Sequence, residues 1–351
     1  MIRSLSHVDI AFDRPDARFE PGEEIAGTVR VDGYAELDYR RIRLDLLWRT
    51  RGDGSMDQGE RSSLDLDGEG HLDEGETREF RFSLEAPDEP FTWKGRHFAV
   101  EWVVEARVDV PGSDARAEQT FILEPGEGSR DAPYQSGGPF VVPDDPERHR
   151  QIRTSVSYGC GLVFGVPLLL MGVLFVAASL WSGDAAGVAS VMGVAVGAVM
   201  IGLGGLFVFA TVRRHWSERA LREVDARLDP WSVRPGETVR FRLRLVPDVL
   251  MTVTGVHVRL DGEERAVLSR ASRSGQSFRR SIHEEVCSLD APAEPLAPGA
   301  AGEWEAAFHV PDEAPFTFRA HHNRVQWTVA ATVEIAGRAD WGTILELQVR
   351  P

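Results

Sequence analysis

Histidines and clustered acids are the residues of this sequence whose chemistry could be catalytic or metal-binding. His321 and His322 are adjacent, and His97 stands at the matching point of an earlier, similar segment. A metal ion needs several ligands that converge on one point, whereas neighbours on a strand point to opposite faces. We therefore expect these histidines to form structural hydrogen bonds at the start of strands, without a metal site.

Four acidic side chains, Asp65, Asp67, Glu69 and Asp73, resemble a calcium loop in composition. Their spacing and the absence of a closing glutamate differ from such a loop, so weak calcium binding is only an alternative. The sequence has no Gly-x-Ser-x-Gly elbow, no phosphate-binding Gly-Lys-Ser/Thr and no Cys-x-x-Cys pair. We expect no catalytic residue, no cofactor and no enzymatic activity.

Two apolar segments, Tyr158–Trp181 and Val188–Val212, are 24 and 25 residues long, and Asp184 is the only formal charge from 155 to 212. As helices they would be about 36 Å long, enough to cross a bilayer core of about 30 Å. The alternative is a buried hairpin in a soluble core. Soluble helices seldom stay apolar on every face over such a length, so the sequence predicts a transmembrane hairpin at 155–212.

Basic residues flank this hairpin, whereas its turn carries none. Because basic flanks stay on the cytoplasmic side, we expect an integral protein of a plasma or bacterial inner membrane. Both soluble regions would be cytoplasmic and the short turn would lie outside. The flanking residues are Arg148, Arg150, Arg153, Arg213 and Arg214.

Glycines recur at four-residue spacing in both arms, at Gly161 and Gly165 and at Gly193 and Gly197. Such spacing lets helix backbones approach closely. We expect the two arms to pack on each other; a homo-oligomer formed through a glycine face is the alternative. Neither arm carries an aspartate, glutamate, lysine, arginine or histidine, which argues against an ion or proton pathway through this hairpin alone.

The regions on either side of the hairpin repeat one another. Each contains short runs of alternating apolar residues separated by proline and glycine turns, which is typical of β-sandwiches. The segment from Pro90 to Gly112 aligns without a gap to the segment from Pro315 to Gly337, with 10 of 23 positions identical. Phe91 matches Phe316, and Trp102 matches Trp327; we expect both tryptophans in the core. The sequence thus predicts a tandem pair of β-domains split by a hairpin.

The repeat resembles the arrestin-like family, which includes arrestins, α-arrestins, retromer arrestin-like subunits and bacterial sporulation-control relatives. The similar segments are 19–29 and 86–111 in the first copy, with 233–243 and 310–336 in the second. The resemblance implies two immunoglobulin-like sandwiches and a non-catalytic adaptor role. It transfers no site residue, and the acidic first copy lacks a basic cluster for receptor phosphate.

The predicted fold is mainly β, with two immunoglobulin-like, arrestin-type sandwiches separated by a two-helix transmembrane hairpin. The domains are a first sandwich at 1–124, a proline-, glycine- and acid-rich linker with a basic juxtamembrane end at 125–154, the hairpin at 155–212, a basic juxtamembrane segment at 213–222 and a second sandwich at 223–351.

Charge is unevenly distributed along the chain. Residues 1–146 carry 33 acidic and 17 basic side chains, a net charge of −16, whereas residues 147–351 carry 22 of each. A nucleic-acid partner is excluded because it would need a basic face. We expect a membrane-tethered scaffold that binds membrane-associated proteins. The alternative is a structural subunit of a transport or envelope assembly that uses its glycine-rich hairpin as the interface.

Overall fold

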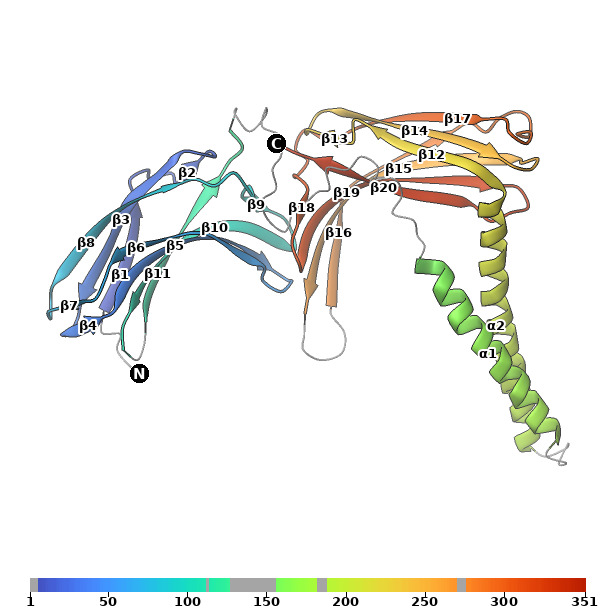
Figure 1. Cartoon of the computed structure of the whole chain (residues 1–351), viewed down its shortest axis with the longest axis horizontal. Coiled ribbons are helices and arrows are strands. Elements are labelled where there is room, and N and C mark those ends of the chain that lie inside the picture. The colour runs from blue at the N-terminus through green and yellow to red at the C-terminus, as the bar shows by residue number, and fades with distance from the viewer. Residues whose placement is uncertain (1–5, 112–113, 127–155, 182–187, 270–275) are drawn as a thin grey trace.

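The computed structural model describes residues 6–111, 114–126, 156–181, 188–269 and 276–351. Two sets of β-sheets, each forming a sandwich, are separated along the chain by an apolar helical hairpin (Figure 1), which confirms the predicted mainly-β fold class. The predicted linker from residue 127 onward and the hairpin turn at 182–187 lie outside the described residues.

The first sandwich packs a three-stranded sheet on a six-stranded one. The small sheet has the order β1 (Ser6–Phe12), β3 (Glu24–Gly33), β8 (Thr77–Glu85). The large sheet has the order β2 (Arg18–Phe19), β11 (Ala115–Leu123), β10 (Phe98–Asp109), β5 (Arg41–Gly52), β6 (Gln58–Asp67), with β9 (Trp93–Lys94) also paired to β10. A separate ladder joins β4 (Leu37–Tyr39) to β7 (Gly70–Leu72).

The second sandwich repeats this topology strand for strand. Its small sheet is β12 (Leu221–Asp229), β14 (Thr238–Pro247), β17 (Gly302–His309). Its large sheet is β13 (Ser232–Val233), β20 (Trp341–Val349), β19 (Asn323–Ile335), β15 (Val253–Leu268), β16 (Gln276–Leu289), with β18 (Phe318–Arg319) on β19. The ladder formed by β4 and β7 belongs to the first sandwich.

The cores follow from strict alternation along the central strands. In β19 every second residue from Asn323 to Ile335 is buried, and β10 follows the same period except that Val103 is buried as well. Trp102 and Trp327 are fully buried, as predicted. Each indole N–H donates to a proline carbonyl, at 2.6 Å to Pro90 and 3.0 Å to Pro315. A buried indole needs such an acceptor, so the repeated Pro-Phe-Thr segment is positioned by the tryptophan twelve residues later.

The hairpin consists of α1 (Val156–Trp181), which contains Pro167, and α2 (Val188–Arg219). Both are long and apolar enough to span a membrane, with mean hydropathies of 2.1 over Phe164–Trp181 and 2.3 over Val191–Val212. Only 11% of each of these stretches is buried in the protein. The alternative of a hairpin enclosed in a soluble core therefore disagrees with the structure.

The second helix runs directly into the second sandwich. The predicted basic segment at 213–222 falls on the last turns of α2, which continues to Arg219, and on the start of β12 at Leu221. No glycine or proline interrupts residues 213–220, so nothing in the sequence ends the helix earlier. The residue between them, Ala220, is buried, and its carbonyl accepts a bond from the Asp248 N–H at 2.8 Å.

Three of the four predicted packing glycines meet the opposite helix of the same hairpin. A Cβ added at Gly165 would lie 3.0 Å from the Phe207 Cβ, and one at Gly197 would lie 2.8 Å from the Gly172 carbonyl oxygen. Gly193 faces Ser179 in the same way. Gly161 belongs to α1, but its surroundings lie outside the described part of the chain.

We predict that Gly197→Leu destabilises the hairpin by about 1–3 kcal/mol, because its side chain would overpack the helix contact. A Cβ there would lie 2.6 Å from the Val176 Cγ2. The measurement is thermal unfolding in detergent micelles. The matched control is Gly202→Leu, since a Cβ at Gly202 meets nothing within 4 Å. Equal effects of the two substitutions would contradict the packing.

Candidate functional site

The two sandwiches meet at a seam where each buries a carboxylate against the other. Glu264, on β15 of the second sandwich, is fully buried. Its Oε1 accepts the backbone N–H groups of His97 at 2.7 Å and Phe98 at 3.0 Å, and its Oε2 accepts that of Arg96 at 3.1 Å. These amides lead into β10 of the first sandwich. Hydrogen bonds that a carboxylate accepts from N–H groups are stronger than those between neutral groups.

Asp57 makes the reciprocal contact from the first sandwich, immediately before β6. It is 8% exposed. Its carboxylate accepts the N–H of His322 at 3.0 Å and that of Asn323 at 3.0 Å, where β19 begins. The Asn323 side-chain amide donates to Asp57 at 2.8 Å and to the Thr50 hydroxyl at 2.9 Å. Burying a polar group is costly unless it is hydrogen-bonded, and the carboxylate of Asp57 has several donors.

The seam has approximate two-fold symmetry between the repeats. His97 and Phe98 match His322 and Asn323 in the repeat alignment, so each sandwich offers the same strand entry to the other's carboxylate. The matching rings of Phe91 and Phe316 contact each other with centroids 5.7 Å apart. The tandem copies therefore pack like the two subunits of a symmetric homodimer.

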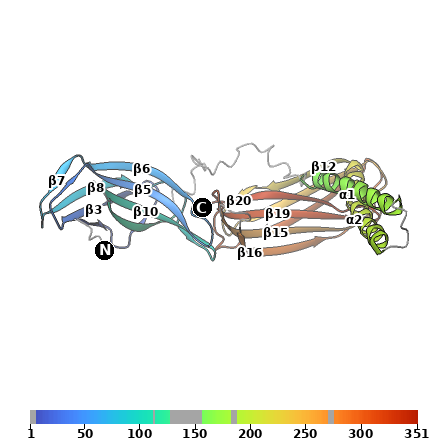
Figure 2. The same cartoon turned by 90° about the horizontal axis from the view of Figure 1, so that it is seen from below.

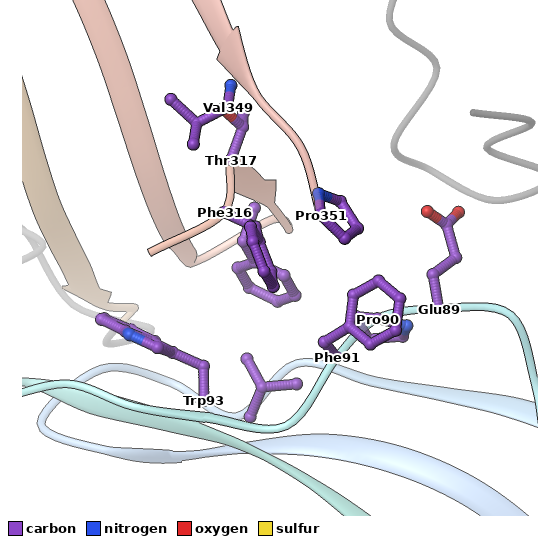
Figure 3. A pocket seen from close by; sticks show the side chains of 10 residues that line it. Glu89, Pro90, Phe91, Trp93, Phe316, Thr317, Val349 and Pro351 are labelled. Carbon is purple, nitrogen blue, oxygen red and sulfur yellow. The ribbon is translucent and has the colours of Figure 1, made fainter. Parts of the chain in front are cut away.

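Aromatic side chains fill the rest of the seam. The ring of Phe318 lies 6.0 Å from that of Trp48 and 5.7 Å from that of Phe98. Beside them is a small cavity of about 40 Å³, lined from the first sandwich by Pro90, Phe91 and Trp93 and from the second by Phe316 and Pro351 (Figure 3). A typical ligand pocket is several hundred cubic ångströms, so this cavity suits seam packing better than a small-molecule ligand.

The histidines lie at this seam, although the reasoning that placed them on strands was wrong. His321 and His322 occupy a bend before β19, with ring centroids 4.4 Å apart, and so do not point to opposite faces. His97 Nδ1 lies 2.9 Å from Asp53 Oδ2, and its ring packs on Phe278 of the second sandwich at 5.8 Å. The expected hydrogen-bonding role holds for His97.

The acidic stretch does not form the calcium loop that the sequence left open. Asp67 accepts the Tyr39 hydroxyl at 2.6 Å, and Asp65 lies 3.8 Å from Arg41. Asp73 instead joins Glu36 and His71 in an exposed group whose ligand atoms are within 4.8 Å of one another. Carboxylate and imidazole ligands of this kind suit zinc. Sequence reasoning missed Glu36 and His71 because the pairing of β4 with β7 brings them together.

The predicted membrane-flanking arginines are only partly covered by the structure. Arg213 and Arg214 belong to the last turns of α2, while their side chains lie outside the described part. Arg148, Arg150 and Arg153 also fall outside the described residues. The membrane-flanking role of these five residues therefore stays a prediction.

Comparisons with known proteins assign this chain to no family. No protein-family model matches the chain, and no curated protein matches it either. Among solved structures it is similar to the sporulation control protein Spo0M from Bacillus subtilis, with 14% identity and a TM-score of 0.31. That match covers 80% of this chain and 91% of the Spo0M chain.

We predict that Glu264→Ala weakens the docking of the sandwiches by about 3 kcal/mol, because three buried amides lose their acceptor. Weaker docking should appear as a lower unfolding temperature. It should also broaden the distribution of distances between two spin labels, one attached to each sandwich. Glu263→Ala is the control, since the neighbouring side chain points to the outer face of the same strand. Glu264→Gln keeps an acceptor oxygen and should cost less. Indistinguishable behaviour of Glu264→Ala and Glu263→Ala would argue against the seam.

A second prediction concerns pH. The Asp38 carboxylate accepts a hydrogen bond from Nδ1 of His71 at 2.7 Å and thereby raises the pKa of His71 above its usual value, assisted by the charges of Asp73 and Glu36. The protonated imidazole thus stabilises the fold below its ordinary pKa, and this contribution is lost as pH rises through the raised value. Histidine NMR titration should place His71 above an exposed histidine, and Asp38→Asn should lower its pKa. An Asp38→Asn titration that matches the wild type would refute the assignment.

Proposed function

We propose that this chain is a non-enzymatic adaptor anchored in a membrane by its helical hairpin. It presents both sandwiches at the cytoplasmic face, with the hairpin turn outside, and binds membrane-associated proteins there. The basic flanks of the hairpin support this orientation, because basic residues are retained on the cytoplasmic side. The proposed membrane is a plasma membrane or a bacterial inner membrane.

One observation carries this proposal: a single buried residue separates the apolar helix α2 from the first strand of the second sandwich. Ala220 joins Arg219 to Leu221, and the Asp248 N–H bonds to its carbonyl at 2.8 Å. A flexible linker would let the domain drift over a wide volume. This junction instead fixes the height and the orientation of the sandwich relative to the helix.

The seam extends this fixed placement to the first sandwich. Glu264 and Asp57 each hold backbone amides of the other sandwich, so the two move as one body. Figure 1 shows the helices projecting from the end of the second sandwich that is remote from the seam. A tether of this type raises the local concentration of the whole body around other membrane proteins, which is useful for a scaffold.

The open edge of the larger sheet in the second sandwich is the partner site that we favour. Strand β16 is the terminal strand of its sheet and runs for 14 residues. Its Val286 is an exposed apolar side chain, 58% accessible. An extended peptide can add to such an edge through main-chain hydrogen bonds. Charged residues along β16, among them Arg279 and Glu284, restrict indiscriminate pairing with other strands.

The second function considered from the sequence, assembly through the hairpin glycines, has less support. Gly165, Gly193 and Gly197 face the other helix of their own hairpin, so they are engaged within one chain. Packing inside the hairpin accounts for their spacing without a second subunit.

The test is site-specific photo-crosslinking of the full chain in native membranes, with a photoreactive residue replacing Val286. We expect a discrete crosslinked membrane protein. The matched position is Ala307, which is exposed on β17 in the other sheet. Crosslinks that are equal at both positions, or only to a second copy of this chain, would contradict the adaptor proposal at this edge.

The orientation has its own readout in the same cells. In a Cys160→Ser, Cys287→Ser background, Asp184→Cys should react with an impermeant maleimide from outside. Ser281→Cys, on β16, should react only after permeabilisation. The reverse pattern would contradict the proposed sidedness and leave the fold untouched.

A further inference from the structure

A row of four arginines crosses the outer face of the six-stranded sheet in the second sandwich. Arg279 of β16 is directly opposite Arg265 of β15, which is opposite Arg324 of β19, which is opposite Arg319 of β18. Directly opposed residues project from the same face of a sheet, with Cβ atoms about 5 Å apart. We call these four residues the arginine row.

Most of the positive charge of this row has no counterion in the fold. Arg319 pairs with Glu346 at 2.6 Å, whereas Arg265 donates to the Ser277 hydroxyl at 3.2 Å. Among the residues that the structure describes, no carboxylate forms an ion pair with Arg265, Arg279 or Arg324. The buried Nε of Arg324 has no hydrogen-bond partner. Like charges directly opposite each other are destabilising, so a fold keeps such a row at a cost.

The electrostatic surroundings of Arg324 agree with this geometry. Its partial burial lowers its pKa, and the guanidinium groups of Arg265, Arg319 and Arg279 lower it further. Glu263, two residues from Arg265 on the same face, acts in the opposite direction. An anion placed over the row would relieve this repulsion.

The first sandwich also has opposed arginines on its larger sheet, but each of them has a counterion. Arg107 of β10 is opposite Arg43 of β5 and Arg116 of β11 on the outer face of the matching sheet. Each has a nearby carboxylate: Asp45 at 2.7 Å from Arg43, Glu105 at 2.8 Å from Arg107 and Asp114 at 3.6 Å from Arg116. Opposed arginines in this type of sheet can therefore be neutralised by carboxylates of the same sandwich. In the second sandwich most of the arginine row is not neutralised in this way.

The six-stranded sheet that carries the arginine row is the layer of the second sandwich on the side toward which the helices project. In Figure 1 the sheet of β15, β19 and β20 lies between the small sheet of β12, β14 and β17 and the descending helices. Figure 2, seen from below, shows β20, β19, β15 and β16 in front together with α1 and α2. If the hairpin crosses a bilayer, as proposed above, this sheet is the layer of the second sandwich on the membrane side.

We propose that the arginine row binds the anionic headgroups of the leaflet from which the hairpin enters the membrane. This inference rests on the proposed membrane anchoring. Guanidinium groups bind phosphate oxygens through paired hydrogen bonds, and a row spread over four strands suits several headgroups better than one small ion. Each basic residue close to an anionic leaflet strengthens the binding of a protein to that leaflet. The acidic first sandwich is repelled by that leaflet, so the row would orient the whole body.

The test uses the full chain in lipid nanodiscs of neutral phosphatidylcholine, with or without anionic phosphatidylglycerol. A fluorophore is attached at Ser281→Cys in a Cys160→Ser, Cys287→Ser background, and headgroup nitroxides act as the quencher. Ser281 is exposed and lies opposite Glu263, beside the row. We expect quenching to rise with the fraction of phosphatidylglycerol. Arg265→Gln, Arg279→Gln and Arg324→Gln combined should weaken the contact equilibrium on the order of a hundredfold, at about fivefold per arginine.

Arg242→Gln with Arg244→Gln is the matched control. These exposed arginines lie on β14 in the other sheet, near Glu305 and Glu303 respectively. The control should keep the dependence on phosphatidylglycerol, and the unfolding temperature of the triple variant should not fall. A label at Ala307→Cys, on the opposite layer, should show no such quenching.

Three results would overturn the inference. Equal quenching in neutral and anionic discs would do so, as would quenching unchanged in the triple variant. Loss of quenching in inorganic phosphate, but not in chloride of equal ionic strength, would assign the row to free phosphate instead. A chain that stayed soluble without lipid would overturn the proposed anchoring itself. A chain that enters the discs, but whose quenching does not depend on phosphatidylglycerol, would overturn only this inference.

Discussion

The arrangement of this molecule depends on backbone amides at the entries to its two central strands. The N–H groups of residues 96–98 and of residues 322–323 are directed across the seam to a carboxylate of the other sandwich. Buried amides must find an acceptor, and a charged acceptor in a dry seam is costly unless it is fully bonded. Each sandwich therefore completes the hydrogen bonding of the other. Neither contact is satisfied when the sandwiches part, so the seam favours one relative placement.

Much of the fold was predictable because its determinants are local in sequence. Alternating apolar residues indicated the strands, and the uninterrupted apolar arms indicated the helices. The shared Pro-Phe-Thr segment and its distant tryptophan established the repeat, since a buried indole holds that segment in both copies. The apolar span ends at Val212, whereas α2 itself continues to Arg219, because a run of arginines suggests a membrane boundary but does not end a helix.

The seam was not predictable in the same way. Phe91 and Phe316 were recognised as equivalent positions, yet equivalence between repeats does not reveal that the two residues touch. Asp57 lies in a glycine-rich acidic stretch that resembles a solvent-exposed loop, and Glu264 is one of two adjacent glutamates. Only the pairing of β15 shows that Glu264 points inward while Glu263 points outward. Long-range contacts of this kind depend on strand register, which composition and spacing leave open.

The seam also constrains how the chain can be threaded through a bilayer. Because the sandwiches contact each other directly, they must lie on the same side of any membrane that the intervening segment crosses. An odd number of spans would separate them, leaving Glu264 and Asp57 as exposed charges without their amide partners. Two apolar helices between the repeats satisfy this condition whichever way the hairpin inserts. Hence the number of spans and the reciprocal seam are linked, and the flanking arginines need to select only which side the joined sandwiches occupy.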